Sequence, residues 1–284
     1  MTALRQRMIE DMKLRRLAPG TQTAYLRSVR GLAQHYNKPP DQISDEELRN
    51  YVVYLIEDRQ LAPNSWAAVL SGIKFLYTHT LKREWPLEKV VCSPKARHLP
   101  VVLSTDEVSQ ILGLVRSEAV RPCLHTIYAC GLRISEGVGL TIADIDSTRM
   151  QLLIRASKGD KDRYVPLPKP ILDQLRAYWL THRHPVYVFP KRGHSTATDT
   201  LSRKTVWNVF KTVLAESGVR KDATVHTLRH SWATHLLEAG VPLTLLQRWL
   251  GHNSPRTTLL YTHVTQQAED QAIQALYDLI AGLS

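Results

Sequence analysis

Residues 226–240 read HTLRHSWATHLLEAG. On a helix, His226 and Arg229 share one face, so an imidazole and a guanidinium can converge on one anion. The histidines could instead be ordinary polar residues of the surface or core, or His226 and His230 could chelate a metal. A metal site would need a third ligand and usually a nearby carboxylate, and the H-E-x-x-H pattern is absent. The stretch therefore predicts a helix with an anion site and no metal.

Two segments upstream carry further basic residues. GLRISE, residues 131–136, places Arg133 and Glu136 three positions apart just after an expected helix end. By itself this spacing is typical of a surface ion pair. Lys158 lies at the turn of residues 150–168, where two short apolar runs flank Ser-Lys-Gly-Asp-Lys-Asp and predict a β-hairpin. A lysine in a hairpin turn is usually only solvated, so neither segment is specific alone.

Downstream, residues 250–263 read LGHNSPRTTLLYTH. Gly251 is a natural stop after a helix, and Ser254-Pro255 is a natural start for the next one. His252 is therefore expected in a tight turn, with Tyr261 near the end of a short helix. A single tyrosine on a short helix is more often a packing residue than a nucleophile.

The rest of the chain predicts a mainly α protein. Before residue 92, helices are expected over 21–36, from the Ser44–Glu47 capping box onward, and over 64–81, as part of a bundle of about four. SPKARHLP, residues 93–100, has two prolines and no periodicity and predicts an extended basic linker. A second capping box, Ser104–Glu107, opens a helix, another ends near Gly131, and a short strand is expected over 186–189.

Composition limits the class of protein. The chain has 284 residues, a formal charge of +11 and 43% hydrophobic residues, as expected for a folded basic protein with a polyanionic partner. The excess positive charge is shared between residues 1–98 and the remainder. No run is apolar enough for a membrane span or a signal peptide. Cys92, Cys123 and Cys130 form no C-x-x-C pair, which indicates neither disulfides nor zinc and favours a reducing cytosol.

Taken in order, these segments resemble the tyrosine recombinase family, also called the lambda-integrase-like or phage integrase family. GLRISE resembles its first arginine box, SKGDKDRYVPLP its lysine hairpin, HTLRHSWATHLLEAG its H-x-x-R box and LGHNSPRTTLLYTHV its histidine and tyrosine box. LPVVLSTDEVSQILG and GLRISEG are especially similar to integron integrases and Xer-type recombinases. The integron-specific insertion after LDQLRAYWLTHRHP is absent, and Gly137 stands where many members have a larger apolar residue.

The resemblance covers essentially the whole chain. It implies a helical core-binding, SAM-like domain over residues 1–92, the basic linker over 93–100, and an α+β catalytic domain with a small sheet over 101–284. Double-stranded DNA is the implied partner, and neither a metal nor a nucleotide cofactor is implied.

The resemblance also assigns roles to residues. Tyr261 would attack a DNA phosphodiester and form a 3′-phosphotyrosyl link, and Glu136 would orient Arg133 or its helix, although a plain structural ion pair explains it almost equally well. The remaining assignments are scissile-phosphate binding by Arg133, Arg229 and His252, leaving-group protonation by Lys158, assistance of proton transfer by His226, and DNA phosphate contacts by Lys95, Arg97 and His98.

The expected working unit is a tetramer on two DNA sites in the bacterial cytosol, of one protein or of two related recombinases. The C-terminal helix, Gln266–Leu283, has an apolar stripe that would dock on a neighbouring protomer or pack on its own domain. Two other functions stay open: a type IB topoisomerase-like relaxing enzyme, and a DNA-binding architectural protein without catalysis. The biological role could be integration, transposition, dimer resolution or inversion.

Overall fold

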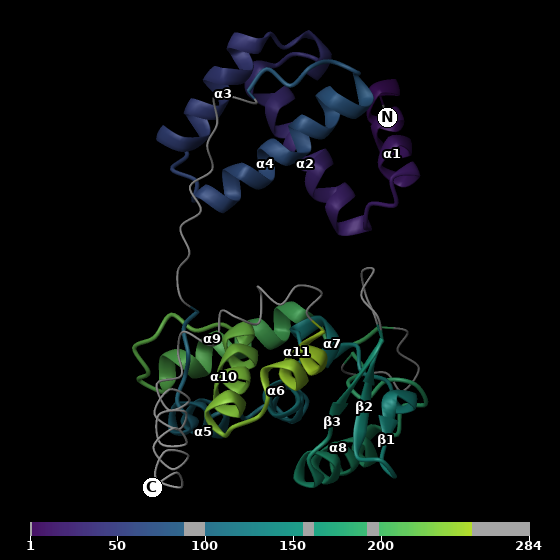
Figure 1. Cartoon of the computed structure of the whole chain (residues 1–284), viewed down its shortest axis with the longest axis vertical. Helices are drawn as coiled ribbons and strands as arrows, with labels where there is room; N and C mark the ends of the chain where they lie inside the picture. Colours follow the sequence, from purple (N-terminus) through teal and green to yellow (C-terminus); the bar gives the residue numbers. More distant parts are fainter. Residues whose placement is uncertain (1, 88–99, 156–161, 192–198, 252–284) are drawn as a thin grey trace, which may run out of the picture. The chain divides into compact units, whose positions relative to one another are not determined.

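The computed structural model describes residues 2–87, 100–155, 162–191 and 199–251. The chain divides into two compact units, residues 1–97 and 98–284 (Figure 1). The domain limits expected from the sequence stay a prediction, because residues 88–99 lie outside the described part of the chain. Within the described ranges, no helix has both the length and the apolar character that a membrane crossing requires.

In its described residues the first unit contains four α-helices, in agreement with the bundle of about four expected from the sequence. Local signals set where they begin: proline occupies the first turn of α2 and α4, and Ser44 and Glu47 form the expected capping box at the start of α3. The helices are α1 (Ala3–Leu14), α2 (Pro19–Tyr36), α3 (Asp45–Glu57) and α4 (Pro63–Phe75), with a 3₁₀ turn, η1 (Pro40–Gln42), and a π-helical turn, η2 (Leu76–Thr80).

Two apolar clusters hold this unit together. Leu32, Leu48 and Ile73, from α2, α3 and α4, are fully buried in one of them. Met8 and Met12 bury the inner face of α1 in the other, against residues of α2 and of η2. Because each helix buries only one stripe, this packing rather than helix propensity supplies most of the stability.

The second unit combines seven α-helices and a small sheet in its described residues. The predicted capping box is present, since Ser104 Oγ accepts a hydrogen bond from Glu107 N and the Glu107 carboxylate accepts one from Ser104 N. The helices are α5 (Thr105–Gly113), α6 (Val120–Ala129), α7 (Ile134–Val138), α8 (Lys169–His182), α9 (Arg203–Glu216), α10 (Val225–Glu238) and α11 (Leu243–Leu250), with a 3₁₀ turn, η3 (Ile142–Asp144).

The sheet contains the predicted hairpin and one strand that the sequence did not indicate. It is antiparallel, in the order β1 (Ile145–Asp146), β2 (Gln151–Ile154), β3 (Arg163–Pro166), with Leu152 opposite Val165 and Ile154 opposite Arg163. The predicted strand over 186–189 was wrong. Its apolar residues Val188 and Phe189 are buried in the core, and its backbone forms an isolated bridge between Thr141 and Tyr187, with hydrogen bonds from Ile142 N to the Val186 carbonyl and from Val188 N to the Leu140 carbonyl, rather than a strand of the sheet.

Helix α10 packs against α6 in the second unit (Figure 1). Three contacts fix it: Leu228 joins the large apolar core, Leu103 N donates to Ser231 Oγ (2.9 Å), and Trp232 Nε1 donates to the carbonyl of Ala129 at the end of α6 (3.1 Å). The stretch that carries the predicted anion site is therefore attached to the segment that leads into GLRISE.

Candidate active site

A tight corner after α6 positions Arg133. Gly131 has a φ of +61°, the left-handed region that glycine adopts most readily, and a Cβ there would lie 2.3 Å from the Trp232 ring. The chain therefore passes directly over the Trp232 ring and turns into α7, where Arg133 is the N-cap. This geometry explains why GLRISE begins with glycine.

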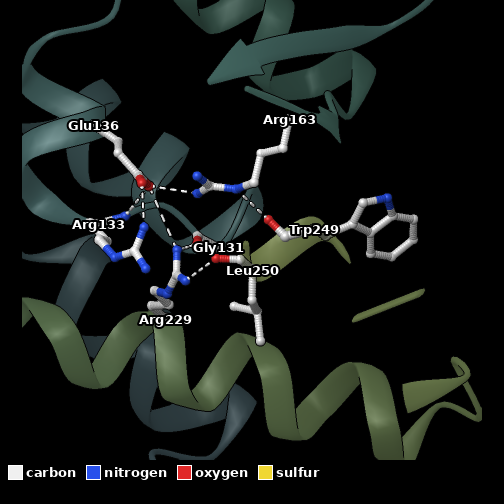
Figure 2. Close-up of polar contacts among 7 residues, drawn as sticks. All are labelled: Gly131, Arg133, Glu136, Arg163, Arg229, Trp249 and Leu250. Atoms are coloured by element: carbon white, nitrogen blue, oxygen red, sulfur yellow. Dashed lines mark hydrogen bonds and ion pairs between the residues drawn. The ribbon is translucent and has the colours of Figure 1, made fainter. Parts of the chain in front are cut away.

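Glu136 lies one turn into α7 and accepts hydrogen bonds from two arginines. Its Oε1 accepts from Arg133 Nη1 (2.8 Å), and its Oε2 accepts from Arg163 Nη2 (2.8 Å) and from the backbone N–H of Arg133 (2.8 Å). Arg229 Nη1 adds an ion pair at 3.6 Å from Oε2 (Figure 2). One carboxylate thus brings together guanidinium groups from α7, β3 and α10.

The electrostatics of this cluster favour an anionic ligand. Burial by itself raises the pKa of Glu136, but the hydrogen bond and charge of Arg163, the Arg133 backbone N–H and the charge of Arg229 outweigh it, so the pKa lies below its ordinary value. The carboxylate is therefore ionised at neutral pH and compensates only one of three positive charges. The excess charge suits a phosphate group.

The two predicted arginines differ in burial. The Arg133 side chain is 33% exposed, whereas Arg229 is 1% exposed. Arg229 Nη1 donates to the carbonyl of Gly131 (2.8 Å), and Arg229 Nη2 donates to the carbonyl of Leu250 at the end of α11. Arg229 thereby links three helical segments, while the Arg133 side chain is one-third exposed.

His226 and His230 lie one turn apart on α10, with ring centroids 4.5 Å apart in an edge-to-face arrangement. Desolvation by the surrounding protein, followed by the charges of Arg229 and Arg133, lowers the pKa of His226. Burial, followed by the charges of His226 and Arg229, lowers the pKa of His230 to about 4. Both rings are therefore neutral at pH 7. Among the described residues, no group of histidine, cysteine and carboxylate side chains could hold a metal ion.

Arg163 is a member of the cluster that the sequence analysis missed. Its side chain is 6% exposed, and its Nε donates to the carbonyl of Trp249 (2.7 Å). The signal was the alternation of β3: Arg163 and Val165 are buried whereas Tyr164 is exposed, so an arginine occupies an inward position of the strand. An inward arginine requires a buried partner, which a single sequence does not identify.

The other site residues predicted from the sequence lie outside the described residues. This applies to Lys158, His252 and Tyr261, and to the linker residues Lys95, Arg97 and His98. Their neighbours in the chain are described: Ile154 and Arg163 flank the hairpin turn, and Gly251 precedes His252. Gly251 ends α11 in the left-handed conformation (φ +64°), as its helix-stop position predicts.

Gly137, which departs from the family pattern, has a local explanation. A Cβ at this position would lie 2.5 Å from Ile127 Cγ1. The Ile127 side chain of α6 therefore occupies the space that a larger residue at position 137 would need.

The sequence matches two families that cover most of the chain. Residues 102–268 match the phage integrase family, and residues 4–87 match the N-terminal SAM-like domain of phage integrases. A protein of Sinorhizobium fredii named as an integrase/recombinase, y4qK, is 42% identical over 267 residues, which cover 93% of this chain and 85% of that protein. The tyrosine recombinase XerD of Shewanella oneidensis is 31% identical, with 88% of each chain covered.

A solved structure has the same fold over nearly the whole chain. The Tn1549 transposon integrase, in a complex with a circular intermediate DNA, superposes with a TM-score of 0.72 at 17% identity, covering 97% of this chain and all of that one.

The chain belongs to the phage integrase family, the tyrosine recombinases. It is accordingly a DNA-breaking and DNA-rejoining enzyme of the site-specific recombinase class, with the expected fold of a SAM-like helical domain and a mainly helical catalytic domain with a small sheet. The cluster around Glu136 lies within the part of the chain that matches the phage integrase family.

Proposed function

We propose that this enzyme cuts duplex DNA at a specific site through attack by Tyr261, with Arg133 and Arg229 binding the scissile phosphate. The observation that carries this proposal is the convergence of both arginines on Glu136, in a buried cluster with excess positive charge. Such a preorganised pair of guanidiniums suits the charge that develops on the non-bridging oxygens in the transition state.

The reaction exchanges one phosphodiester for another. The Tyr261 oxygen forms a bond to phosphorus, the bond from phosphorus to the 5′ oxygen breaks, and the phosphate stays on the 3′ oxygen of the DNA. The phenol loses its proton and the departing 5′ oxygen gains one. Because the phosphotyrosyl ester resembles the bond that was broken, the reverse attack by a 5′-hydroxyl reseals a strand without ATP or a metal.

Proton transfer falls to residues around the arginines. A neutral His226 can accept a hydrogen bond or a proton near the nucleophile, and the lowered pKa of its ring supports this role. Lys158, carried by the β2–β3 hairpin, is the proposed acid for the 5′ oxygen, and His252 is proposed to donate a hydrogen bond to the phosphate. Glu136 orients Arg133 through both its backbone and its side chain.

We further propose a tetramer, of one protein or two, that holds two DNA sites and exchanges strands through a Holliday junction in the bacterial cytosol. Proteins of the same fold have been solved with DNA, among them XerH bound to its difH substrate and the Tn1549 integrase with transposon right end DNA. The chain has an excess of positive charge, and Lys95, Arg97 and His98 lie in the segment between the domains. This charge and these side chains suit contacts of both domains with the phosphates of the DNA backbone. The segment Gln266–Leu283 is the proposed contact between protomers.

A library of nicked duplexes with randomised arms tests this proposal. After cleavage near the nick, the short strand that ends in a 5′-hydroxyl diffuses away and leaves the protein linked to DNA. Denaturing gels detect the adduct, and sequencing of the attached DNA reveals any site preference. Wild-type protein should form the adduct with an enriched sequence, Tyr261→Phe should not, and Tyr164→Phe, which removes an exposed hydroxyl from the hairpin, should behave as wild type.

Other outcomes would favour other functions. An adduct with Tyr261→Phe would show that the nucleophile is a different residue. An adduct without sequence enrichment, together with relaxation of supercoiled plasmid, would favour a type IB topoisomerase-like enzyme. Tight binding to duplex DNA with no adduct from wild-type protein would favour an architectural DNA-binding protein.

A further inference from the structure

The carbonyl groups at the end of α11 are held by two different arginines. Arg163 donates to the carbonyl of Trp249, and Arg229 donates to that of Leu250, the next residue. Both arginines also contact Glu136 Oε2, at 2.8 and 3.6 Å (Figure 2). One carboxylate is therefore connected through two guanidiniums to the backbone that precedes His252.

Arg163 has a different role from the arginines proposed to bind phosphate. Its two directional contacts use two different nitrogens of the guanidinium, Nη2 to Glu136 and Nε to Trp249, and its side chain is only 6% exposed. A phosphate bound at the partly exposed Arg133 would therefore have no direct contact with Arg163. The planar fork of arginine holds two acceptors in a fixed geometry, whereas the ammonium group of lysine is a compact point charge without this fork.

Gly251 makes the contact between β3 and α11 possible. A Cβ on Gly251 would lie 2.9 Å from Arg163 Cδ and 3.2 Å from Arg163 Nε. The absence of a side chain lets the Arg163 stem lie against the backbone where α11 ends. The position of this turn therefore depends on the Arg163 side chain as well as on the φ of Gly251.

We propose that Arg163 is a positioning residue for strand cleavage: through Glu136 it orients Arg133, and through the Trp249 carbonyl it fixes the turn that leads into His252. The proposal rests on the proposed function. It predicts that Arg163 affects the rate of the chemical step and contributes little to DNA affinity, because it acts through Glu136 and the Trp249 carbonyl and does not itself contact DNA.

The test compares Arg163→Lys with wild-type protein on the nicked duplex recovered from the randomised library. Lysine keeps the charge and removes the fork. Arg155→Lys is the matched control, because Arg155 follows β2 in the same hairpin and pairs with Asp144 (2.7 Å), but its side chain is 63% exposed. The measurements are the single-turnover rate of adduct formation at saturating DNA, the Kd for the intact duplex and the thermal midpoint.

Arg163→Lys should slow adduct formation at least tenfold, with a Kd within twofold of wild type, while Arg155→Lys should match wild type in both. A duplex with sulfur in place of the scissile 5′ oxygen adds a second readout, because a thiolate leaves without an acid. That substrate should rescue Lys158→Ala but not Arg163→Lys. If the rate of adduct formation falls only as much as a lower thermal midpoint or a weaker Kd explains, the positioning role is wrong. It is also wrong if the sulfur-containing duplex restores the rate of Arg163→Lys.

Two outcomes separate this inference from the proposed function. If wild-type protein forms the adduct and Arg163→Lys forms it at the wild-type rate, the positioning role is wrong and the proposed function stands. If wild-type protein forms no adduct, the proposed function fails, and the role of Arg163 fails with it. Should Arg163→Lys not fold, Gly251→Ala displaces the same side chain and should show the same slow step at unchanged Kd.

Discussion

Arg163 Nη2 lies 2.8 Å from Glu136 Oε2, and both side chains are only 6% exposed. This pair joins the hairpin to α7 in the interior of the catalytic unit. A buried ion pair gains little net stability over an apolar pair of the same shape, but loss of one partner leaves an uncompensated charge, which is costly. The pair therefore makes Glu136 sensitive to substitution in both stability and activity.

Replacement of Glu136 by glutamine should lower the free energy of unfolding by about 2–4 kcal/mol, because three guanidiniums would lose their common carboxylate. Urea unfolding measures the effect. Asp173→Asn is the control, because its pair with Lys169 is exposed and should contribute under about 1 kcal/mol. Equal, small effects of both substitutions would contradict the central role of Glu136.

Substitutions of the two predicted phosphate-binding arginines should both reduce activity but should differ in their effect on stability. Arg133→Ala should reduce adduct formation by about 100- to 1000-fold. Its effect on unfolding should stay within about 1 kcal/mol, since the side chain is one-third exposed.

Arg229→Ala should impair both properties. Its loss should cost about 3–5 kcal/mol of stability as well as activity, because a buried charge and two carbonyl groups would lose their partner. Unfolding curves and single-turnover rates on the same preparations measure both effects. An Arg229→Ala protein with wild-type stability would contradict the structural part of its role.

Gly131→Ala should be far more destabilising than Gly218→Ala. Both glycines have positive φ, +61° and +73°, so alanine incurs a similar backbone strain of about 1 kcal/mol at each. At Gly131 the new Cβ would also overlap the Trp232 ring, whereas at Gly218 nothing lies within 4 Å. The overlap should add about 1–3 kcal/mol. Similar unfolding free energies for the two variants would show that the corner after α6 can shift without cost.

His230 should make the protein less stable in mild acid. Its pKa is about 4 in the folded chain and about 6.5 when unfolded, so the unfolded state binds the proton more readily between these values. The contribution to the free energy of unfolding is therefore complete above pH 6.5 and declines as the pH falls toward 4. After allowance for partial exposure it should amount to about 1–2 kcal/mol.

The measurement is the unfolding free energy of wild type and His230→Gln at pH 7 and at pH 4.5. The glutamine side chain does not titrate, so the variant should lose less stability over this interval than wild type does. The same loss in both proteins would assign the pH dependence to other groups, such as His226.

The amino-acid sequence by itself determined the local elements of this protein. The capping boxes at Ser44 and Ser104, the hairpin and the helix stop at Gly251 were all predicted, because each depends on contacts within a few residues. The sequence also placed Arg133, Glu136, His226 and Arg229 in one candidate site through resemblance to the family.

Only the tertiary structure decided which buried side chains meet. Arg163 contacts Glu136, which is 27 residues away in the sequence, and Arg229 contacts the Gly131 carbonyl, which is 98 residues away. These contacts form because α6, α10 and β3 pack around the same core. Tertiary packing also explains why the apolar segment 186–189 is not a strand of the sheet. Its hydrophobic side chains are buried in the core, and this burial does not require the segment to pair as a strand. Periodicity reports that a residue is buried, whereas long-range packing selects its partner.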